Sequence, residues 1–363
     1  MVKSIWRNFD FLLFGTVVIL SLFGIVMIQS AIAGNIELSG YVNRQVTFVL
    51  IGIAVIILFA LINYQYWASI TKLMYVFAVG FLVVIFIVGE ARFGSARWFE
   101  TGLFSIQPSE LAKIILVLVM ADYFAKSWEQ PKDFNWVFRS FVLMMGVVVW
   151  IILQPNLSTS IVIMVLWFAF LWISGLPPKY LIWFALIGIV VGLFFFQFVM
   201  EDYQKTRITQ FLVPDPTARH GNTYNVDQAL ISIGSGGLFG QGYGQGSQVQ
   251  LRFLKVRHTD FIFSAMAEEF GFVGTTVVIL LLLFVIVRCF IIAQQAPDQF
   301  GALIAFGFGV LMVFQMAVNI GVNMNVIPVT GLTLPFISYG GSSILSLSLG
   351  IGLVESVAVR RNS

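Results

Sequence analysis

The sequence predicts an all-α polytopic membrane protein with about ten transmembrane helices, and three observations support this fold class. Hydrophobic residues make up 59% of the 363 residues and charged residues only 10%, whereas soluble domains carry about 25% charged residues. Long stretches are almost free of charge, as transmembrane helices are. No stretch shows the alternation of polar and apolar residues that marks a strand of a membrane β-barrel.

Ten apolar stretches are each long enough to cross the roughly 30 Å hydrocarbon core of a bilayer as a helix. The connection Gln154-Pro155-Asn156 is so short that it could be a kink within one helix, which would leave nine spans. The predicted spans run approximately over 11–31, 46–63, 71–89, 108–125, 137–154, 157–174, 181–200, 261–287, 300–324 and 340–358.

Basic residues gather on one side of this ten-span arrangement, and the positive-inside rule makes that side cytoplasmic. The first apolar run is too long for the core of a signal peptide, so we expect it to be retained. Both termini then lie inside the cell. We expect one membrane domain over residues 1–363, with extracytoplasmic loops at about 90–107 and 201–260. The basic residues are Lys3, Arg7, Lys72, Lys126, Lys132, Arg139, Lys179, Arg288, Arg360 and Arg361.

Charge and cysteine usage exclude several classes of function. The net charge is only +3 and the basic residues form no run, so nucleic-acid binding is not expected. Cys289 is the single cysteine and excludes a disulfide within the chain. No cluster of histidine, cysteine and acidic residues has the spacing of a zinc site.

The second loop contains the glycine-rich segment SIGSGGLFGQGYGQGSQ at 232–248. Such a run could offer backbone N–H groups to a phosphate. However, the segment has neither the Gly-Lys-Ser/Thr ending of a P-loop nor a G-x-G-x-x-G motif at a strand–helix turn. A flexible or tightly turning loop is therefore the favoured interpretation.

Two ionisable residues open the fourth predicted span, in QPSELAKIILVLVMADYF. Glu110 and Lys113 are three residues apart, so they share a helix face and can pair. Ionisable residues at membrane depth are candidate functional residues. A structural ion pair, or a lysine that extends to the membrane interface, fits the spacing as well.

The eighth predicted span follows the motif His258-Thr259-Asp260. On a helix, Asp260, Ser264 and Glu268 would lie along one face. Asp260 could be a functional carboxylate, or it could cap the helix, as could Thr259. His258 could be a general base or a hydrogen-bonding residue of the loop.

The segment NMNVIPVTGLTLPFISYGGSS joins the ninth and tenth spans and interrupts helix at membrane depth. Broken backbone is tolerated there only where it is buried in protein or lines a cavity. The segment could be a re-entrant hairpin that only packs. It could also line an outward-facing polar cavity together with Glu110, Lys113 and Asp260. The helix-breaking residues are Pro328, Gly331, Pro335, Gly340 and Gly341.

These features fit two classes of protein. One is an enzyme that acts on a lipid-linked substrate at the outer leaflet, and the other is a transporter or flippase for such a substrate. The residue pattern alone leaves both open.

At these residues the chain resembles the SEDS family (shape, elongation, division and sporulation), and it resembles the RodA branch more than the FtsW branch. The similarity lies in four long blocks that occur in the family's order. They are ARWFETGLFSIQPSELAK (96–113), DQALISIGSGGLFGQGYGQGSQ (227–248), HTDFIFSAMAEEFGFVG (258–274) and PVTGLTLPFISYGGSS (328–343).

The chain departs from the family pattern at three places. In Gln154-Pro155-Asn156-Leu157-Ser158-Thr159, Asn156 and Ser158 replace the acid and the glycine of the family motif Q-P-D-L-G-T. Lys255-Val256 replaces the usual Pro-Glu before Arg257-His258, and Asn325 stands where glycine is common in the family. None of these departures changes Asp260, Glu110 or Lys113, so we expect only loop geometry and partner contacts to differ.

The resemblance implies a peptidoglycan glycosyltransferase that polymerises lipid II during cell-wall elongation. It further implies that the partners are a class B penicillin-binding protein and other membrane proteins of the elongation complex. The implied ligands are lipid II and a glycan linked to undecaprenyl pyrophosphate. A divalent cation (Mg²⁺ or Mn²⁺) could assist the leaving pyrophosphate. Asp260 would be catalytic. The implied substrate-binding residues are Glu110, Lys113, Arg92, Arg97, Trp98, Gln107, His258, Thr259 and Ser343.

Overall fold

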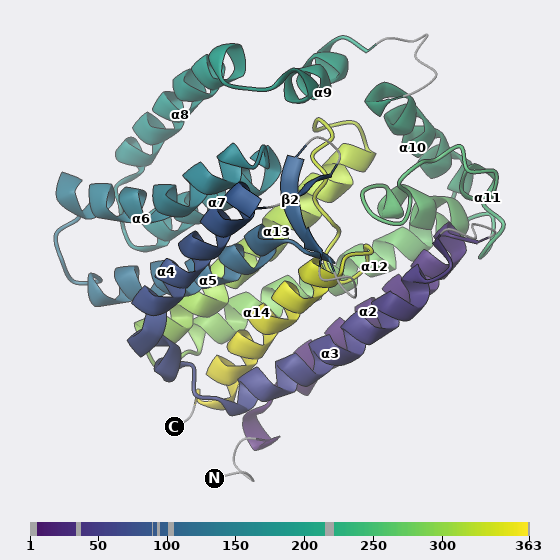
Figure 1. Cartoon of the computed structure of the whole chain (residues 1–363). Coiled ribbons are helices and arrows are strands. Elements are labelled where there is room, and N and C mark those ends of the chain that lie inside the picture. The colour runs from purple at the N-terminus through teal and green to yellow at the C-terminus, as the bar shows by residue number, and fades with distance from the viewer. Residues whose placement is uncertain are drawn as a thin grey trace.

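The structure is a computed structural model that describes residues 6–33, 38–88, 90–92, 95–100, 105–214 and 221–361. It is a helical bundle with one small sheet (Figure 1). The longer helices are α2 (Phe11–Ala31), α3 (Tyr41–Leu61), α4 (Gln65–Val88), α5 (Pro108–Lys126), α6 (Phe134–Leu153), α7 (Leu157–Ile173), α8 (Pro178–Phe198), α12 (Ile262–Gln294), α13 (Gln299–Asn323) and α14 (Gly341–Val359).

Each of the ten predicted spans coincides with one of these helices, which confirms the helical membrane fold class. Eight of the described helices are long and apolar enough to cross a membrane, and α7 is a shorter apolar helix. Helix α5 carries four charged residues, so its assignment as a span stays a prediction. The connection at 154–156 is not a kink, because Asn156 begins a new helix by accepting a hydrogen bond from Thr159 N at 3.3 Å.

Similar caps begin several other helices. Asp133 accepts from Trp136 N at 2.8 Å at the start of α6, and Asp298 accepts from Gly301 N at 2.7 Å at the start of α13. Pro108 is the first residue of α5, where the missing N–H of proline costs nothing because an N–H at this position has no partner within the helix. These residues fix the helix ends, and the apolar stretches supply the helix interiors.

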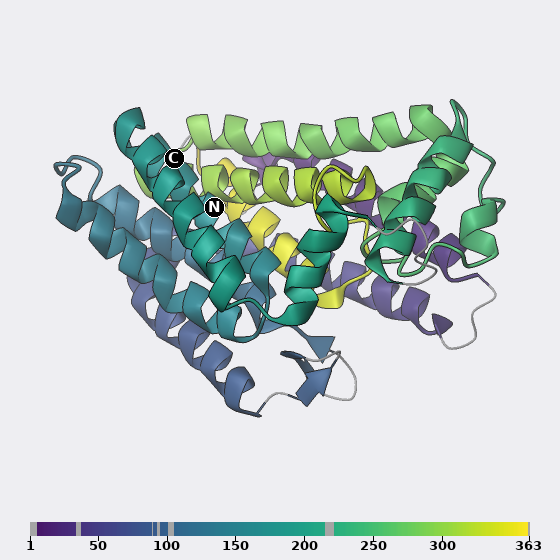
Figure 2. The same cartoon turned by 90° about the horizontal axis from the view of Figure 1, so that it is seen from above.

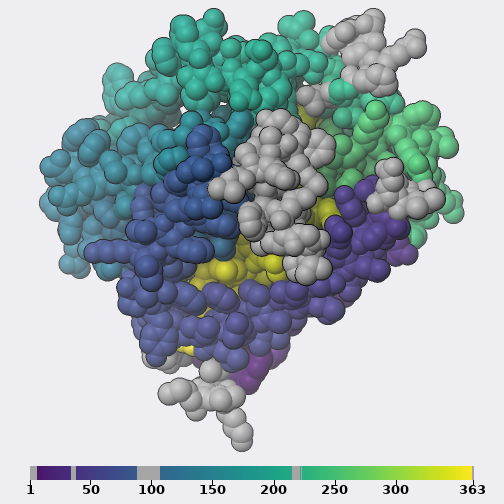
Figure 3. All heavy atoms as spheres, viewed as in Figure 1, coloured from purple at the N-terminus to yellow at the C-terminus, as the bar shows by residue number. Residues whose placement is uncertain are grey.

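The helices pack as neighbours in a compact bundle (Figures 1 and 2). Helix α3 lies along α14, α12 along α13, and α4 along α5. In Figure 3, α14 is visible between α3 and α4 on one face of the molecule. Helix α8 stands at the edge, and none of its residues is buried. The buried centre therefore lies around α5, α13 and α14.

The two ends of the described chain meet at one end of the bundle. Asn8 Nδ2 donates to the carbonyl oxygen of Val359 at 3.2 Å, and Asp10 N donates to Glu355 at 3.0 Å. Arg288 from α12 joins this contact through a 2.9 Å bond to Asp10. Both ends of the described chain therefore lie on the same side of the bundle, as the charge distribution predicts.

The segment 201–260 is more helical than the sequence predicts. It contains α9 (Asp202–Leu212), α10 (Asn222–Gly236) and the short α11 (Ser247–Gln250). The predicted extracytoplasmic loop therefore contains three helices, which the sequence did not predict. Apolar residues of α10, among them Val226 and Ala229, are buried and anchor it to the bundle.

The glycine-rich segment packs against a break in α12. Gly271 has φ 66°, and a Cβ on this residue would lie 2.3 Å from Gly240 N. The backbone donors and acceptors freed by the break bond to the segment, as between Gln241 N and the carbonyl of Glu268 at 2.9 Å. Phe272 N likewise donates to Gly237 O at 2.9 Å. The glycines therefore serve a tight turn against α12, as the favoured interpretation predicts.

The sheet lies between α4 and α5 and was not predicted. Its antiparallel strands are β1 (Glu90–Arg92), β2 (Ser95–Glu100) and β3 (Ser105–Ile106), in the order β1-β2-β3. Arg92 lies on β1, and Arg97 and Trp98 lie on β2. The side chains of residues 88–106 are outside the described part of the structure.

Candidate functional site

Asp260 lies just before the eighth span rather than on it. Helix α12 begins at Ile262, its N-cap residue is Phe261, and no side chain of that cap residue bonds to the helix. The prediction that Asp260, Ser264 and Glu268 share one helix face was therefore wrong. The alternative in which Asp260 or Thr259 caps α12 was wrong for the same reason.

The broken segment between α13 and α14, residues 324–340, holds the His258-Thr259-Asp260 motif. We refer to residues 324–340 as the hairpin; it contains no helix. Tyr339 N donates to the carbonyl oxygen of His258 at 2.9 Å, and Ser338 Oγ donates to that of Thr259 at 2.7 Å. Gly331 has φ 79°, and a Cβ there would lie 3.8 Å from Asp260 Oδ2. The hairpin therefore bonds to the main chain of this motif, and Gly331 lies close to the Asp260 carboxylate.

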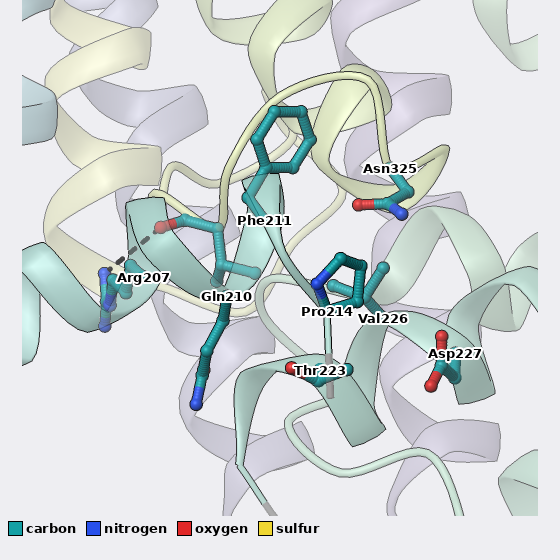
Figure 4. Close-up of a pocket in the computed structure, with 9 residues that line it drawn as sticks. Arg207, Gln210, Phe211, Pro214, Thr223, Val226, Asp227 and Asn325 are labelled. Carbon is teal, nitrogen blue, oxygen red and sulfur yellow. Dashed lines mark hydrogen bonds between the residues drawn. The ribbon is translucent and has the colours of Figure 1, made fainter. Parts of the chain in front are cut away.

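Asp260 has the electrostatics of a general base near neutral pH. Burial raises the pKa of its carboxyl to about 6, while the positive charge of Arg207 and a hydrogen bond with Thr259 oppose this rise. Arg207 lies on α9, and its Nη1 donates to the hairpin at Val329 O over 3.4 Å (Figure 4). Arg207 was not among the predicted site residues, because its position follows from the packing of α9 on the hairpin.

His258 packs beside a stacked pair of tyrosines, Tyr41 and Tyr339, whose ring centroids are 4.4 Å apart. Its ring centroid lies 5.6 Å from that of Tyr41 and 5.9 Å from that of Tyr339. Burial and the neighbouring Arg257 lower the pKa of His258 to about 4. The imidazole is therefore neutral at pH 7, which favours a packing and hydrogen-bonding role.

Glu110 and Lys113 form the expected ion pair inside the bundle. Lys113 Nζ lies 2.7 Å from Glu110 Oε1. Lys113 is 0% exposed and Glu110 is 8% exposed, so the lysine does not extend to the membrane interface. Ser346 Oγ donates to the second carboxylate oxygen of Glu110 at 3.3 Å. The pair is thus connected to α14.

The start of α14 links this pair to the hairpin. Gln107 N donates to Ser342 Oγ at 2.9 Å, and Ser343 Oγ lies 2.8 Å from Thr333 Oγ1 of the hairpin. Ser346, which contacts Glu110, also donates to the carbonyl of Ser343 at 3.0 Å. Asp260 and the Glu110–Lys113 pair therefore belong to one assembly, built around the hairpin.

A small cavity of about 50 Å³ lies on another side of the hairpin (Figure 4). It lies between α9, α10 and the hairpin, and it is not the predicted cavity, which was to be lined by Glu110, Lys113 and Asp260 as well. Neither Asp260 nor Glu110 lines this cavity. Its lining residues are Arg207, Gln210, Phe211, Pro214, Thr223, Val226, Asp227, Asn325 and Val329. Asn325 has φ 54°, which explains why glycine is suited to this position.

A second hollow is entirely apolar and has a volume of about 410 Å³. It lies between α3, α4, α5 and α14, and neither Glu110 nor Lys113 lines it. Its lining residues are Phe59, Trp67, Leu73, Met74, Phe77, Leu111, Ile114, Ile115, Leu118 and Leu349.

The acids deeper in α12 support the loop rather than the candidate site. Glu268 accepts from Gln248 N at 2.7 Å and from Val249 N at 3.2 Å, at the start of α11. Glu269 accepts from Ser30 Oγ of α2. Both are buried. Glu268 therefore fastens the start of α11 to α12, and Glu269 links α12 to α2.

Within the described residues, no group of three or more histidine, cysteine or acidic side chains could hold a metal ion together. Near the hairpin, Glu110 is already paired with Lys113. The described side chains therefore form no complete protein cage for a divalent cation.

Comparisons with known proteins agree with this architecture. The profile of the cell cycle protein family FtsW/RodA/SpoVE matches residues 10–363. A probable peptidoglycan glycosyltransferase FtsW of Thioalkalivibrio sulfidiphilus is 35% identical over 92% of this chain and 85% of the relative. The solved rod-shape-determining protein RodA of Thermus thermophilus is 30% identical, with a TM-score of 0.73 over 99% of both chains.

A further solved structure belongs to a peptidoglycan synthase complex described as coordinating polymerization and crosslinking. The matching chain is 29% identical, with a TM-score of 0.82 over 98% of this chain and 99% of that chain. The similarity therefore extends over nearly the whole length of the molecule.

Proposed function

Since the chain belongs to the FtsW/RodA/SpoVE family of cell cycle proteins and is a peptidoglycan glycosyltransferase, we propose that it polymerises glycan strands from lipid II with Asp260 as base. The observation that carries the role of Asp260 is its placement beside the hairpin, with a pKa of about 6. Such a carboxylate is ionised at pH 7 and still basic enough to accept a proton.

The proposed reaction is an inverting glycosyl transfer. The 4-hydroxyl oxygen of an acceptor GlcNAc forms a bond to C1 of a donor MurNAc, and the bond from C1 to the pyrophosphate oxygen breaks. The hydroxyl proton passes to the Asp260 carboxylate, and undecaprenyl pyrophosphate leaves with the bonding electrons. One base is sufficient, in contrast to the two carboxylates of a glycoside hydrolase.

Lys113 is the proposed cation on the donor side. A leaving pyrophosphate gains negative charge, and a preorganised cation in a dry site stabilises that charge strongly. Lys113 is buried and held by Glu110, so its position is fixed before substrate binds. Arg92 and Arg97 remain candidates for the same task from the sequence. The apolar hollow beside α5 suits the lipid part of such a substrate.

The chain is a multi-pass membrane protein, and we place it in the cytoplasmic membrane with both termini inside. The charge distribution supports this orientation. We also propose a class B penicillin-binding protein as partner, because the matched synthase complex couples polymerization with crosslinking. The elongation role is proposed from the likeness to RodA.

Reconstitution tests the proposed activity against the flippase alternative. The purified chain in liposomes, together with its penicillin-binding partner, should convert fluorescent lipid II into long glycan strands. Movement of lipid II between leaflets without polymer formation would contradict the polymerase proposal and support the flippase. A sample with the partner alone is the matched control.

The pH dependence of polymerisation should report the ionisation of Asp260. The active form is the carboxylate, so the rate should rise with pH through about 6 and then level off. Arg207→Gln removes a positive charge that lowers the pKa of Asp260. The pKa should therefore rise, and the rising part of the pH profile should move to higher pH. Initial rates between pH 5 and 8 measure this shift.

Two variants control this experiment. Arg207→Lys keeps the charge and should keep the profile near that of the wild type. Lys205→Gln removes a charge from the same helix, but Lys205 Nζ bonds to Gln197 O at 3.2 Å and lies away from the hairpin. An equal shift with Lys205→Gln, or no shift with Arg207→Gln, would contradict the assignment.

The topology is testable at Gln245, which is exposed in the glycine-rich segment. Cys289 is buried in α12 and is replaced by serine to remove the only native thiol. In that background, Gln245→Cys should react with a membrane-impermeant maleimide in intact cells. Reaction only after lysis would place segment 201–260 in the cytoplasm and overturn the orientation.

A further inference from the structure

Two asparagines of α13 hold the main chain of Asp260. The carbonyl oxygen of Asp260 accepts a hydrogen bond from Asn323 Nδ2 at 2.9 Å and another from Asn319 Nδ2 at 3.2 Å. The two residues are four apart, so they lie on the same face of the helix. Asn323 is 0% exposed and Asn319 is 1% exposed. Polar side chains this deep in a membrane protein are costly unless they serve the site.

Asn323 also supplies the cap that α12 lacks. Its Oδ1 accepts from Ser264 N at 3.0 Å and from Ser264 Oγ at 2.6 Å. Ser264 is the third residue after the cap residue Phe261, and its N–H is one of the free donors at a helix start. A side chain from another helix therefore caps α12, and the same side chain holds Asp260.

The amide of Asn323 has no freedom to turn. The main-chain N–H of Ser264 can only donate, so it fixes Oδ1 on its side. The Nδ2 atom then faces Asp260 O, and it also donates to Asn319 O at 2.8 Å. Both donors and the acceptor of this amide are used, which makes the side chain a rigid link.

Asn319 connects the same carbonyl to the hairpin. Its Nδ2 donates to Leu332 O at 2.8 Å as well as to Asp260 O. Leu332 directly follows Gly331, the residue beside the Asp260 carboxylate. One amide group thus sets the separation between the main chain of Asp260 and the hairpin.

We propose that Asn319 and Asn323 are positioning residues for glycosyl transfer, which fix Asp260 so that its carboxylate meets the acceptor hydroxyl. This inference rests on the proposed role of Asp260 as base. A base must lie within hydrogen-bonding reach of the proton it accepts. A displacement of roughly 1 Å can cost about 10²-fold in rate.

The test compares two variants with a matched control on the same helix face. Asn319→Leu and Asn323→Leu should each lower kcat for fluorescent lipid II by about 10- to 100-fold, with KM within about twofold of the wild type. Gln315→Leu is the control: Gln315 is one turn before Asn319 and equally buried, but it does not bond to Asp260. It should keep the wild-type kcat.

Ser264→Ala tests whether Asn323 acts through its side-chain link to α12. This change removes the 2.6 Å bond from Ser264 Oγ to Asn323, keeps the main-chain cap bond from Ser264 N, and leaves the bond from Asn323 to Asp260 in place. It should keep kcat near the wild-type value, although it lowers the melting temperature. A loss of kcat equal to that of Asn323→Leu would show that Asn323 acts through its link to Ser264 and not through Asp260, and the proposal would fail.

A variant could lose activity only because part of it does not fold. We therefore measure kcat per folded molecule, and we use Asn319→Leu as a second variant. Asn319→Leu leaves the contacts between Asn323 and Ser264 intact, so it decides the question if Asn323→Leu cannot be purified. A wild-type kcat per folded molecule in Asn319→Leu would overturn the inference. If the wild type itself makes no polymer, the proposed function fails instead, so the two failures are distinct.

Discussion

Asp260→Asn should abolish glycan polymerisation while leaving a folded, membrane-inserted protein. Asparagine is nearly isosteric with aspartate, but its neutral amide cannot accept the acceptor's proton at useful strength. The bonds that hold residue 260 use its main-chain carbonyl, which the substitution leaves unchanged. The side chain does not cap α12. The loss should therefore appear in kcat, by at least about 10²-fold, and not in stability.

The measurement is the amount of polymer made from lipid II by the chain with its penicillin-binding partner. Asp202→Asn is the matched control, because it makes the same chemical change at an exposed position in the first turn of α9. It should polymerise at the wild-type rate. Equal polymer from Asp260→Asn and the wild type would remove Asp260 from the reaction.

Hydrophobicity and length were sufficient to predict the ten long helices, because each apolar stretch must satisfy its backbone internally as a helix in lipid. The same reasoning could not find α9, α10 and α11. They are short and contain many polar residues, and they are stabilised by contacts with α12 and the hairpin rather than by a long apolar run. The three short strands were too brief to give a pattern.

The candidate site was predicted in part. The Glu110–Lys113 pair follows from helical spacing, and the hairpin follows from its prolines and glycines. The asparagines were missed because only ionisable residues were considered at membrane depth. Asn319 and Asn323 are amides with helical spacing in an apolar span, and that spacing was a usable signal. Arg207 depends on the fold of α9 over the hairpin, which no local pattern encodes.

Because the Glu110–Lys113 pair is buried, we expect a second large effect from replacing Lys113. Lys113→Met keeps most of the apolar stem and removes the cation, so it should abolish polymerisation. It should also destabilise the protein, because Glu110 is left buried without its partner. Breaking one side of a buried pair typically costs about 3–5 kcal/mol. Activity loss in this variant alone therefore does not separate catalysis from folding.

The double variant Glu110→Gln, Lys113→Met separates them. Replacing both members of a buried pair with neutral residues is often close to neutral for stability. We expect thermal unfolding of the double variant to return close to the wild-type temperature, while polymerisation stays lower by about 10²-fold or more because the cation for the pyrophosphate is missing. Recovery of both stability and polymer formation would show that the pair only stabilises the bundle.

Lys126→Met is the matched control, since Lys126 pairs with Asp122 at 2.7 Å on the same helix but is exposed at its far end. It should retain both properties, because exposed pairs contribute about 0–1 kcal/mol and Lys126 is remote from the hairpin.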